Sequence, residues 1–180
     1  MELAKPKVRK VHHVAYRCAD ANETARFYTE RLGLEFSRAI VQDRVPSLGE
    51  ACPHIHVFFT LADGSSIAFF ELRDQPPAAR DPNTPEWVQH IAMEVADDAA
   101  LQAARVRLEA GGIEVVGVTE HGFCRSIYFF DPSGHRLELT VRHDDPGEAE
   151  AAAGRAWQEL AHWERDKNAR RAAAPGHRRA

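Results

Sequence analysis

The 180-residue sequence has few cysteines, no long apolar run and no excess of positive charge. Its three cysteines, Cys18, Cys52 and Cys124, are an odd number without CxxC spacing, so they indicate reduced thiols rather than a disulfide framework. No segment reaches the roughly 18 consecutive apolar residues of a membrane span, and the basic residues 1–10 lack the apolar core of a signal peptide. We therefore expect a cytoplasmic protein that does not associate with membranes.

The charge balance also argues against nucleic acid as a partner. The formal net charge is −4, and the basic residues are scattered except at the C-terminus. Hydrophobic residues make up 44% and charged residues 28% of the chain, as in ordinary globular proteins. This length and composition suit one compact domain.

An internal repeat is the strongest positive feature. Residues 13–20, HVAYRCAD, recur as residues 90–97, HIAMEVAD, with His, Ala, Ala and Asp in register. A Glu-Leu pair closes the unit that follows each copy, at Glu71-Leu72 and at Glu138-Leu139. Repetition of a whole unit is a signal about architecture as well as about single elements.

Each unit has the periodicity of a strand, a helix and three further strands. The expected strands are 11–18, 34–41, 56–61, 66–72, 88–95, 113–118, 126–130 and 136–141; the expected helices are 21–32 and 98–110; and the expected loops are 43–53 and 119–125. Asp20 and Asp97 stand where helix N-caps belong.

The predicted fold class is therefore α+β, with two tandem βαβββ modules forming a cupped mixed sheet. The expected domain is 8–145, divided into a first module at 8–73, a proline-rich linker at 74–87 and a second module at 88–142. A C-terminal helix is expected at 147–173, with Trp157 and Trp163 packed on the sheet, on a second subunit or over the mouth of the site. Residues 174–180 are expected to be disordered.

Strand alternation predicts which face the two repeat histidines share. His13 alternates with the bulkier apolar residues that suit packing under a helix, and His90 does the same in the second copy. Both histidines should therefore line the concave face. A carboxylate among apolar neighbours, as at Glu71 and Glu138, is costly to bury unless it is paired or coordinated. Two histidines and two glutamates suit one divalent ion, Fe²⁺, Mn²⁺, Ni²⁺, Co²⁺ or Zn²⁺, rather than Ca²⁺.

Four segments resemble the vicinal oxygen chelate superfamily, which includes glyoxalases, bleomycin resistance proteins, epimerases and extradiol dioxygenases. They are VHHVA at 11–15, ARFYTERLGL at 25–34, QHIA at 89–92 and FFDPSGHRLEL at 129–139, and the resemblance covers about residues 8–142. It implies a cupped sheet, metal ligands at His13, Glu71, His90 and Glu138, and a small-molecule substrate with vicinal oxygens. It also implies a homodimer, with the cup closed either within one chain or between two.

Two chemistries follow from this resemblance. The favoured one is glyoxalase-like: four ligands hold the metal, and Glu71 or Glu138 moves a proton in a lyase or isomerase reaction. The alternative is an extradiol dioxygenase-like enzyme with Fe²⁺ on His13, His90 and Glu138. Tyr128 would then match the active-site tyrosine of catechol 2,3-dioxygenases.

The role of Glu71 decides between these two chemistries. Two points argue against the dioxygenase. The position of the acid/base histidine of these enzymes falls near Ser65-Ser66, and serine cannot do that job. In addition, Glu71 as a ligand would occupy the position that O₂ needs. A metal-free binding protein of the bleomycin-resistance type is a third reading, and the complete His/Glu set argues against it.

Three further residues are candidates for binding the substrate. Arg44 could hold an anionic group, and His56 and His121 border the loops that would determine specificity.

Overall fold

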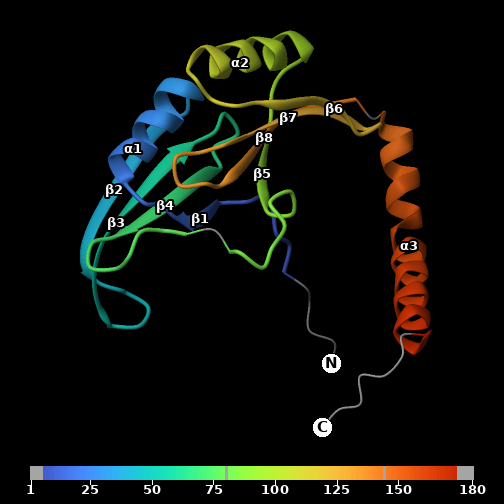
Figure 1. The fold of residues 1–180 in the computed structure, drawn as a ribbon, viewed down its shortest axis with the longest axis horizontal. Coiled ribbons are helices and arrows are strands. Elements are labelled where there is room, and N and C mark those ends of the chain that lie inside the picture. The colour runs from blue at the N-terminus through green and yellow to red at the C-terminus, as the bar shows by residue number, and fades with distance from the viewer. Residues whose placement is uncertain (1–5, 80, 144, 174–180) are drawn as a thin grey trace.

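The computed structural model describes residues 6–79, 81–143 and 145–173, and it contains two four-stranded sheets (Figure 1). The first has the order β1-β4-β3-β2, from β1 (His13–Arg17), β2 (Glu35–Arg44), β3 (Ala51–Thr60) and β4 (Ser66–Leu72). The second has the order β5-β8-β7-β6, from β5 (His90–Glu94), β6 (Val116–Glu120), β7 (Cys124–Phe130) and β8 (Arg136–Arg142). In each sheet the first strand pairs in parallel with the last, and the other pairs are antiparallel. The predicted α+β fold with two βαβββ modules is confirmed; module 1 denotes β1 to β4 with their helix, and module 2 denotes β5 to β8 with theirs.

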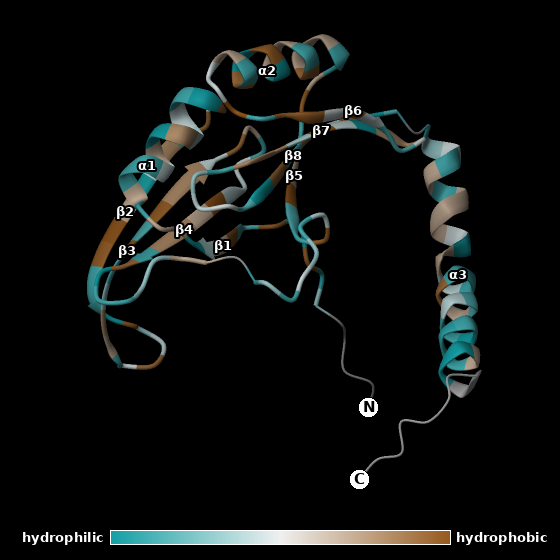
Figure 2. Cartoon of the chain, in the orientation of Figure 1, coloured by the Kyte–Doolittle hydropathy of each residue, from teal (hydrophilic) through white to brown (hydrophobic). Residues whose placement is uncertain are grey.

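One helix packs on each sheet, and both begin at the predicted aspartates. The Asp20 side chain accepts from the Glu23 N–H at 2.7 Å and caps α1 (Ala21–Arg26), which continues into the π-helical turn η1 (Phe27–Arg31). Asp97 caps α2 (Asp98–Ala110) by accepting from the Ala100 N–H at 2.8 Å. Helix α1 contacts β3 and β4, and α2 contacts β7 and β8. In Figure 2 both helices alternate between hydrophilic and hydrophobic residues, as expected for helices with one face on a core.

The two modules share one hydrophobic core on the helix side of the sheets. The buried ring of Tyr28 stacks on Phe59 with centroids 5.1 Å apart, and Phe27 of module 1 meets Phe129 of module 2 at 6.4 Å. The Tyr28 hydroxyl also donates to Asp131 Oδ2 at 3.1 Å, in the turn between β7 and β8. This core fixes how the modules sit relative to one another.

The expected loop at 43–53 is present but shorter, at residues 45–50. Strand β2 continues to Arg44 and β3 begins at Ala51, which leaves only a short turn between them. Pro53 is tolerated because the register shifts between Gln42 and Arg44, so a ladder N–H is not required opposite that irregularity. Strand β6 starts at Val116, later than expected.

The C-terminal helix α3 spans Pro146–Ala173, and the Asp145 carboxylate accepts from the Glu148 N–H at 2.8 Å at its start. Figure 1 shows α3 projecting from the end of the second sheet, away from α1 and α2. Residues 174–180, expected to be disordered, lie outside the described residues. Within the described ranges, no helix is both long and apolar enough to cross a membrane.

Candidate functional site

His90 and Glu138 meet on the concave face of module 2. His90 Nε2 lies 3.1 Å from Glu138 Oε2, although Glu138 is only 6% exposed. The other carboxylate oxygen, Oε1, accepts from the Ser126 hydroxyl. On the far side of the imidazole, His90 Nδ1 lies 3.2 Å from the Val88 carbonyl oxygen. Each side chain is therefore oriented by a hydrogen bond to one of its atoms, and the other atom, Nε2 of His90 or Oε2 of Glu138, faces its partner.

This pair suits a bound cation. Because the Val88 carbonyl can only accept, it holds a hydrogen on Nδ1 of His90 and leaves Nε2 facing the Glu138 carboxylate oxygen at 3.1 Å. A proton or a metal ion between them satisfies both. Imidazole nitrogen and carboxylate oxygen are donors that first-row divalent metals prefer.

Tyr128 and His121 line the same concave face. Together with His90 and Glu138 they border a cavity of about 1010 Å³ that α3 partly covers. The Tyr128 hydroxyl and His121 Nε2 are hydrogen-bonded at 2.7 Å. Burial, followed by the nearby Glu138 carboxylate, raises the pKa of the Tyr128 phenol above its usual value, so the phenol is protonated at neutral pH. The structure thus brings four of the predicted site residues together.

His13 lies on the concave face of module 1 beside other aromatic rings. Its Nδ1 is 2.8 Å from His12 Nδ1, and its ring centroid is 5.5 Å from that of Phe58 and 6.2 Å from that of His56. His56 stacks on Phe70 at 3.6 Å, and its buried Nε2 has no hydrogen-bond partner. Burial lowers the pKa of His56, and the adjacent His13 and His54 lower it further, so this ring is neutral at neutral pH.

Glu71 does not join these residues. It shares a strand face with Ile67 and Phe69, which are buried on the helix side of β4, and its Oε2 accepts from the Ala21 N–H at 2.6 Å at the start of α1. The strand register gives the position that corresponds to Glu138: Ala15 faces Ala68 in module 1 as Ala92 faces Glu138 in module 2. The expectation that Glu71 is a metal ligand or catalytic base therefore has no support in this geometry, because its carboxylate lies on the opposite face of the sheet.

Arg44 is also placed away from the concave faces. Its Nη1 donates to the Gly49 carbonyl at 2.8 Å within the β2–β3 turn. Arg44 does not line the cavity at His90 and Glu138. The structure therefore does not bring this predicted substrate-binding residue to the site.

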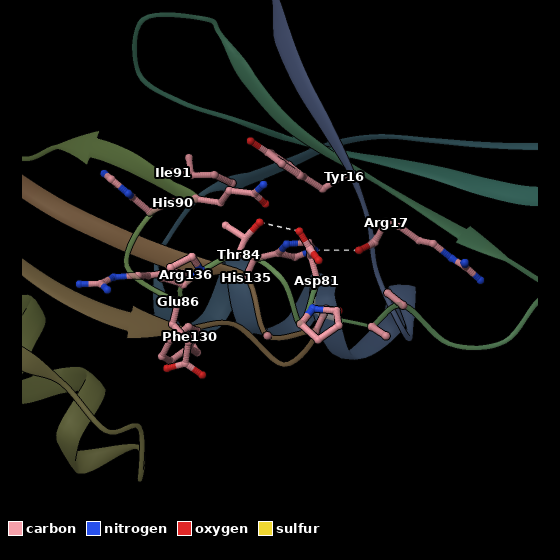
Figure 3. Close-up of a pocket in the computed structure, with 17 residues that line it drawn as sticks. Tyr16, Arg17, Asp81, Thr84, Glu86, His90, Ile91, Phe130, His135 and Arg136 are labelled. Atoms are coloured by element: carbon pink, nitrogen blue, oxygen red, sulfur yellow. Dashed lines mark hydrogen bonds between the residues drawn. The ribbon is translucent and has the colours of Figure 1, made fainter. Parts of the chain in front are cut away.

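The His13 side and the His90 side of the site are separate within one chain. The ring and hydrogen-bond neighbours of His13 all belong to module 1, whereas the cavity at His90 is lined by module 2 and α3. A second cavity, of about 510 Å³, lies between β1 and β5. Figure 3 shows His90 and Arg136 pointing to one side of it and Arg17, which shares a strand face with His13, pointing to the other. In the described part of the chain, no three His, Cys, Asp or Glu side chains form a metal-binding cluster.

Two residues of the site were missed from the sequence. Ser126 anchors Glu138, and the Arg136 guanidinium lies 4.3 Å from the Tyr128 ring centroid with a buried, unpartnered Nε. Arg136 lies on the same face of β8 as Glu138, and Ser126 lies on the same face of the neighbouring β7 as Tyr128. Applying strand parity beyond the first strand of the module would have identified both.

The chain belongs to the glyoxalase/bleomycin resistance protein/dioxygenase superfamily, whose family model matches residues 10–139. Members of this superfamily typically use a divalent metal. Among its relatives is the 2-epi-5-epi-valiolone epimerase of an Actinomyces species, which is 29% identical over 149 residues, covering 74% of this chain and 80% of the relative.

A second relative and a solved structure extend the comparison. MhqA of Bacillus subtilis (strain 168), named as a ring-cleaving dioxygenase, is 26% identical over 144 residues; the match covers 78% of this chain and 43% of MhqA. A glyoxylase/bleomycin resistance protein/dioxygenase domain from Frankia sp. EAN1pec superposes with a TM-score of 0.63 at 21% identity, covering 76% of this chain and all of that one. At that identity the superposition bears on the fold alone.

Proposed function

We propose that the chain is a metal-dependent, ring-cleaving dioxygenase that acts on a small substrate with two vicinal hydroxyl groups. The observation that carries the proposal is the placement of Glu71 on the helix side of β4, with Ala68 at the position that matches Glu138. Of the four predicted ligands, His13, His90 and Glu138 remain on the concave faces. Two histidines and one carboxylate form the ligand set of non-haem Fe²⁺ oxygenases, in which three positions remain open.

The proposal includes a second copy of the chain. Because His13 lies apart from His90 and Glu138 within one chain, we infer that the partner's His13 completes each site in a homodimer. The two concave faces then form one cup across the subunit boundary, and each dimer has two equivalent sites.

The metal would supply chelation of the two substrate oxygens and activation of O₂, and the residues around it have separate tasks. Ser126 and the Val88 carbonyl hold the Glu138 and His90 donors in place. Tyr128, protonated and hydrogen-bonded to His121, can donate to a substrate oxygen and pass a proton to or from that histidine. The Arg136 guanidinium lies over the Tyr128 ring and would add positive charge beside a substrate oxyanion.

A second candidate function is proton transfer next to a chelated carbonyl, as in an epimerase or a glyoxalase-like isomerase. It is favoured by the epimerase relative, of which the chain covers 80%, compared with 43% of MhqA. The same three donors would hold the metal, and the Tyr128–His121 pair would serve as acid and base.

Metal reconstitution with two assays separates these candidates. Apo-protein is loaded anaerobically with Fe²⁺, Ni²⁺ or Co²⁺ and tested with a panel of catechols in an oxygen electrode, and with α-hydroxyketones by proton exchange into ²H₂O. We expect O₂ consumption with Fe²⁺ only. Exchange with Ni²⁺ or Co²⁺ and no O₂ consumption would overturn the dioxygenase in favour of proton transfer, and absence of stoichiometric binding of any of these metals would overturn both.

The shared site has its own test, by subunit mixing. His13→Ala and His90→Ala homodimers should each be inactive, because every site lacks one ligand. After mixing and exchange, a heterodimer has one site with no substitution and one with two, so activity and metal content should return to about a quarter of the wild-type value. No recovery, with subunit exchange demonstrated by native mass spectrometry, would contradict a site shared between copies.

A further inference from the structure

Helix α3 carries a continuous apolar stripe that its own chain leaves uncovered. Small and large apolar residues recur every three or four positions, at Ala149, Ala152, Ala156, Leu160 and Trp163, which places them on one face of the helix. Leu160 is 50% and Trp163 is 66% exposed, and Trp157 at the border of the stripe is 81% exposed. Two exposed tryptophans on one helix are unusual for a surface that meets only water.

The stripe begins inside the candidate site. Ala149 and Ala152 line the same 1010 Å³ cavity as His90 and Glu138, and Leu160 and Trp163 extend the stripe by about two turns beyond it. A partner that enters this cavity therefore lies next to the stripe. A partner that covers the stripe reaches the cavity.

We propose that α3 is a clasp that packs across the second copy's module 1 and holds the partner's His13 side against His90 and Glu138. The inference rests on the proposed shared site, in which a second copy brings the third donor, His13, to this cavity. Module 1 offers apolar surface for the contact on the face of His13, where Ile40, Phe58 and Phe70 are half-buried. The clasp accounts for the tryptophans without any rearrangement of α3.

The clasp assigns α3 a functional role outside the two modules. The family model ends at residue 139, before the helix begins at Pro146. In this scheme the modules supply the donors and α3 determines how long the assembled cup persists. Substitutions in α3 should act on assembly and on metal retention together, without touching a metal ligand.

The test uses the full chain and Trp163→Ala, with Trp87→Ala as the control. Trp87 is 68% exposed, close to the 66% of Trp163, but lies in the linker between the modules. Sedimentation velocity gives the dimer dissociation constant, and equilibrium dialysis gives the Fe²⁺ content. Wild type and Trp87→Ala should sediment as a dimer of about twice 20.1 kDa and bind one Fe²⁺ per chain. Trp163→Ala should raise the dissociation constant at least about tenfold, because a central interface tryptophan is a common hot spot.

Two further readouts keep the inference falsifiable. Circular dichroism should show the same helix content in both variants, because Trp163 is 66% exposed and its removal takes away little packing within its own chain. Leu160→Glu, which introduces a charge into the stripe, should weaken the dimer further. A metal-loaded dimer whose dissociation constant is unchanged in Trp163→Ala and Leu160→Glu overturns the clasp and leaves the shared site standing. A wild-type monomer that binds Fe²⁺ stoichiometrically overturns both. A dimer that both substitutions weaken, but that binds no metal, supports the clasp and overturns the proposed enzyme.

Discussion

Modules 1 and 2 have the same strand order but different chemistry on their concave faces. Where module 2 pairs Tyr128 with Glu138 across two strands, module 1 pairs Phe58 with Ala68 at the matching positions. Of the three proposed metal ligands, the histidine that opens each module is the one that is repeated, as His13 and His90.

This difference shows how a duplicated fold can specialise. Module 2 holds a carboxylate, a phenol and an arginine around its histidine, whereas module 1 surrounds His13 with rings. The first module therefore contributes one donor and an apolar wall, and the second contributes most of the polar groups. Each half is incomplete alone, which is consistent with a site shared between two copies.

The largest effect is expected from removal of a module 2 donor. His90→Ala should abolish stoichiometric metal binding and reduce kcat/KM at least about 1000-fold, because loss of one of three ligands leaves too few to hold the ion. Metal content by mass spectrometry and the O₂ assay measure both effects. The control is His143→Ala, a half-exposed histidine that lies 3.5 Å from Asp98 and away from the donor pair. Full metal content in His90→Ala would rule out His90 as a ligand.

The cysteines of the two modules should differ in reactivity. Cys18 of module 1 is 1% exposed in the core, and burial raises the pKa of its thiol to about 11, whereas Cys124 of module 2 borders the site cavity. At pH 8.5 the thiolate fraction of Cys18 should be about 100-fold below that of a free thiol, so iodoacetamide should modify Cys18 at least that much more slowly. Peptide mass spectrometry over time measures the rates.

The same shift predicts the pH dependence of stability. Because the folded-state pKa of Cys18 lies above its unfolded value of 9.0, the native state holds this proton more tightly. The stabilisation is complete below pH 9.0 and is lost as the pH rises through about 11. The melting temperature of wild type should therefore fall more steeply over this pH window than that of Cys18→Ala. Parallel curves would contradict the assignment.

A smaller effect is expected from exchanging the aromatic pair. Tyr128→Phe makes the module 2 position resemble Phe58 and removes the hydroxyl that bonds to His121. Loss of one proton-transferring group should lower kcat by about 10- to 100-fold with metal content unchanged. A pH–rate profile is the informative measurement, because the limb that reports the Tyr128–His121 pair should disappear in the variant. Phe58→Tyr, the reciprocal control, should leave kcat within about threefold.

Much of this site followed from strand parity applied to the sequence. Parity on the first strand of each module placed His13 and His90 on concave faces, and the two aspartate caps followed from local pattern. Glu71 as a ligand stays a prediction that this geometry does not support, because parity along β4 puts it on the same face as the buried Ile67 and Phe69.

The separation of the two halves could not be predicted in the same way. It depends on how the modules pack, through contacts such as Tyr28 with Asp131 that are 103 residues apart in sequence. Local periodicity carries no information about such contacts. The placement of α3 is a similar case, since periodicity predicts an amphipathic helix but not the cavity that the helix borders.

The smallest predicted effect separates the two Glu-Leu glutamates. Glu71→Ala removes the carboxylate that accepts from the Ala21 N–H at the start of α1, so it should cost about 1 kcal/mol of unfolding free energy, as loss of a helix cap does. Metal content and kcat/KM should stay within about twofold of wild type, because Glu71 faces the helix side of the sheet. Urea unfolding and metal analysis of Glu71→Ala and Glu138→Ala, compared side by side, measure the contrast. If Glu71→Ala lost metal as Glu138→Ala is expected to, the two modules would be chemically symmetric after all, and a four-ligand site with proton-transfer chemistry would replace the three-ligand one.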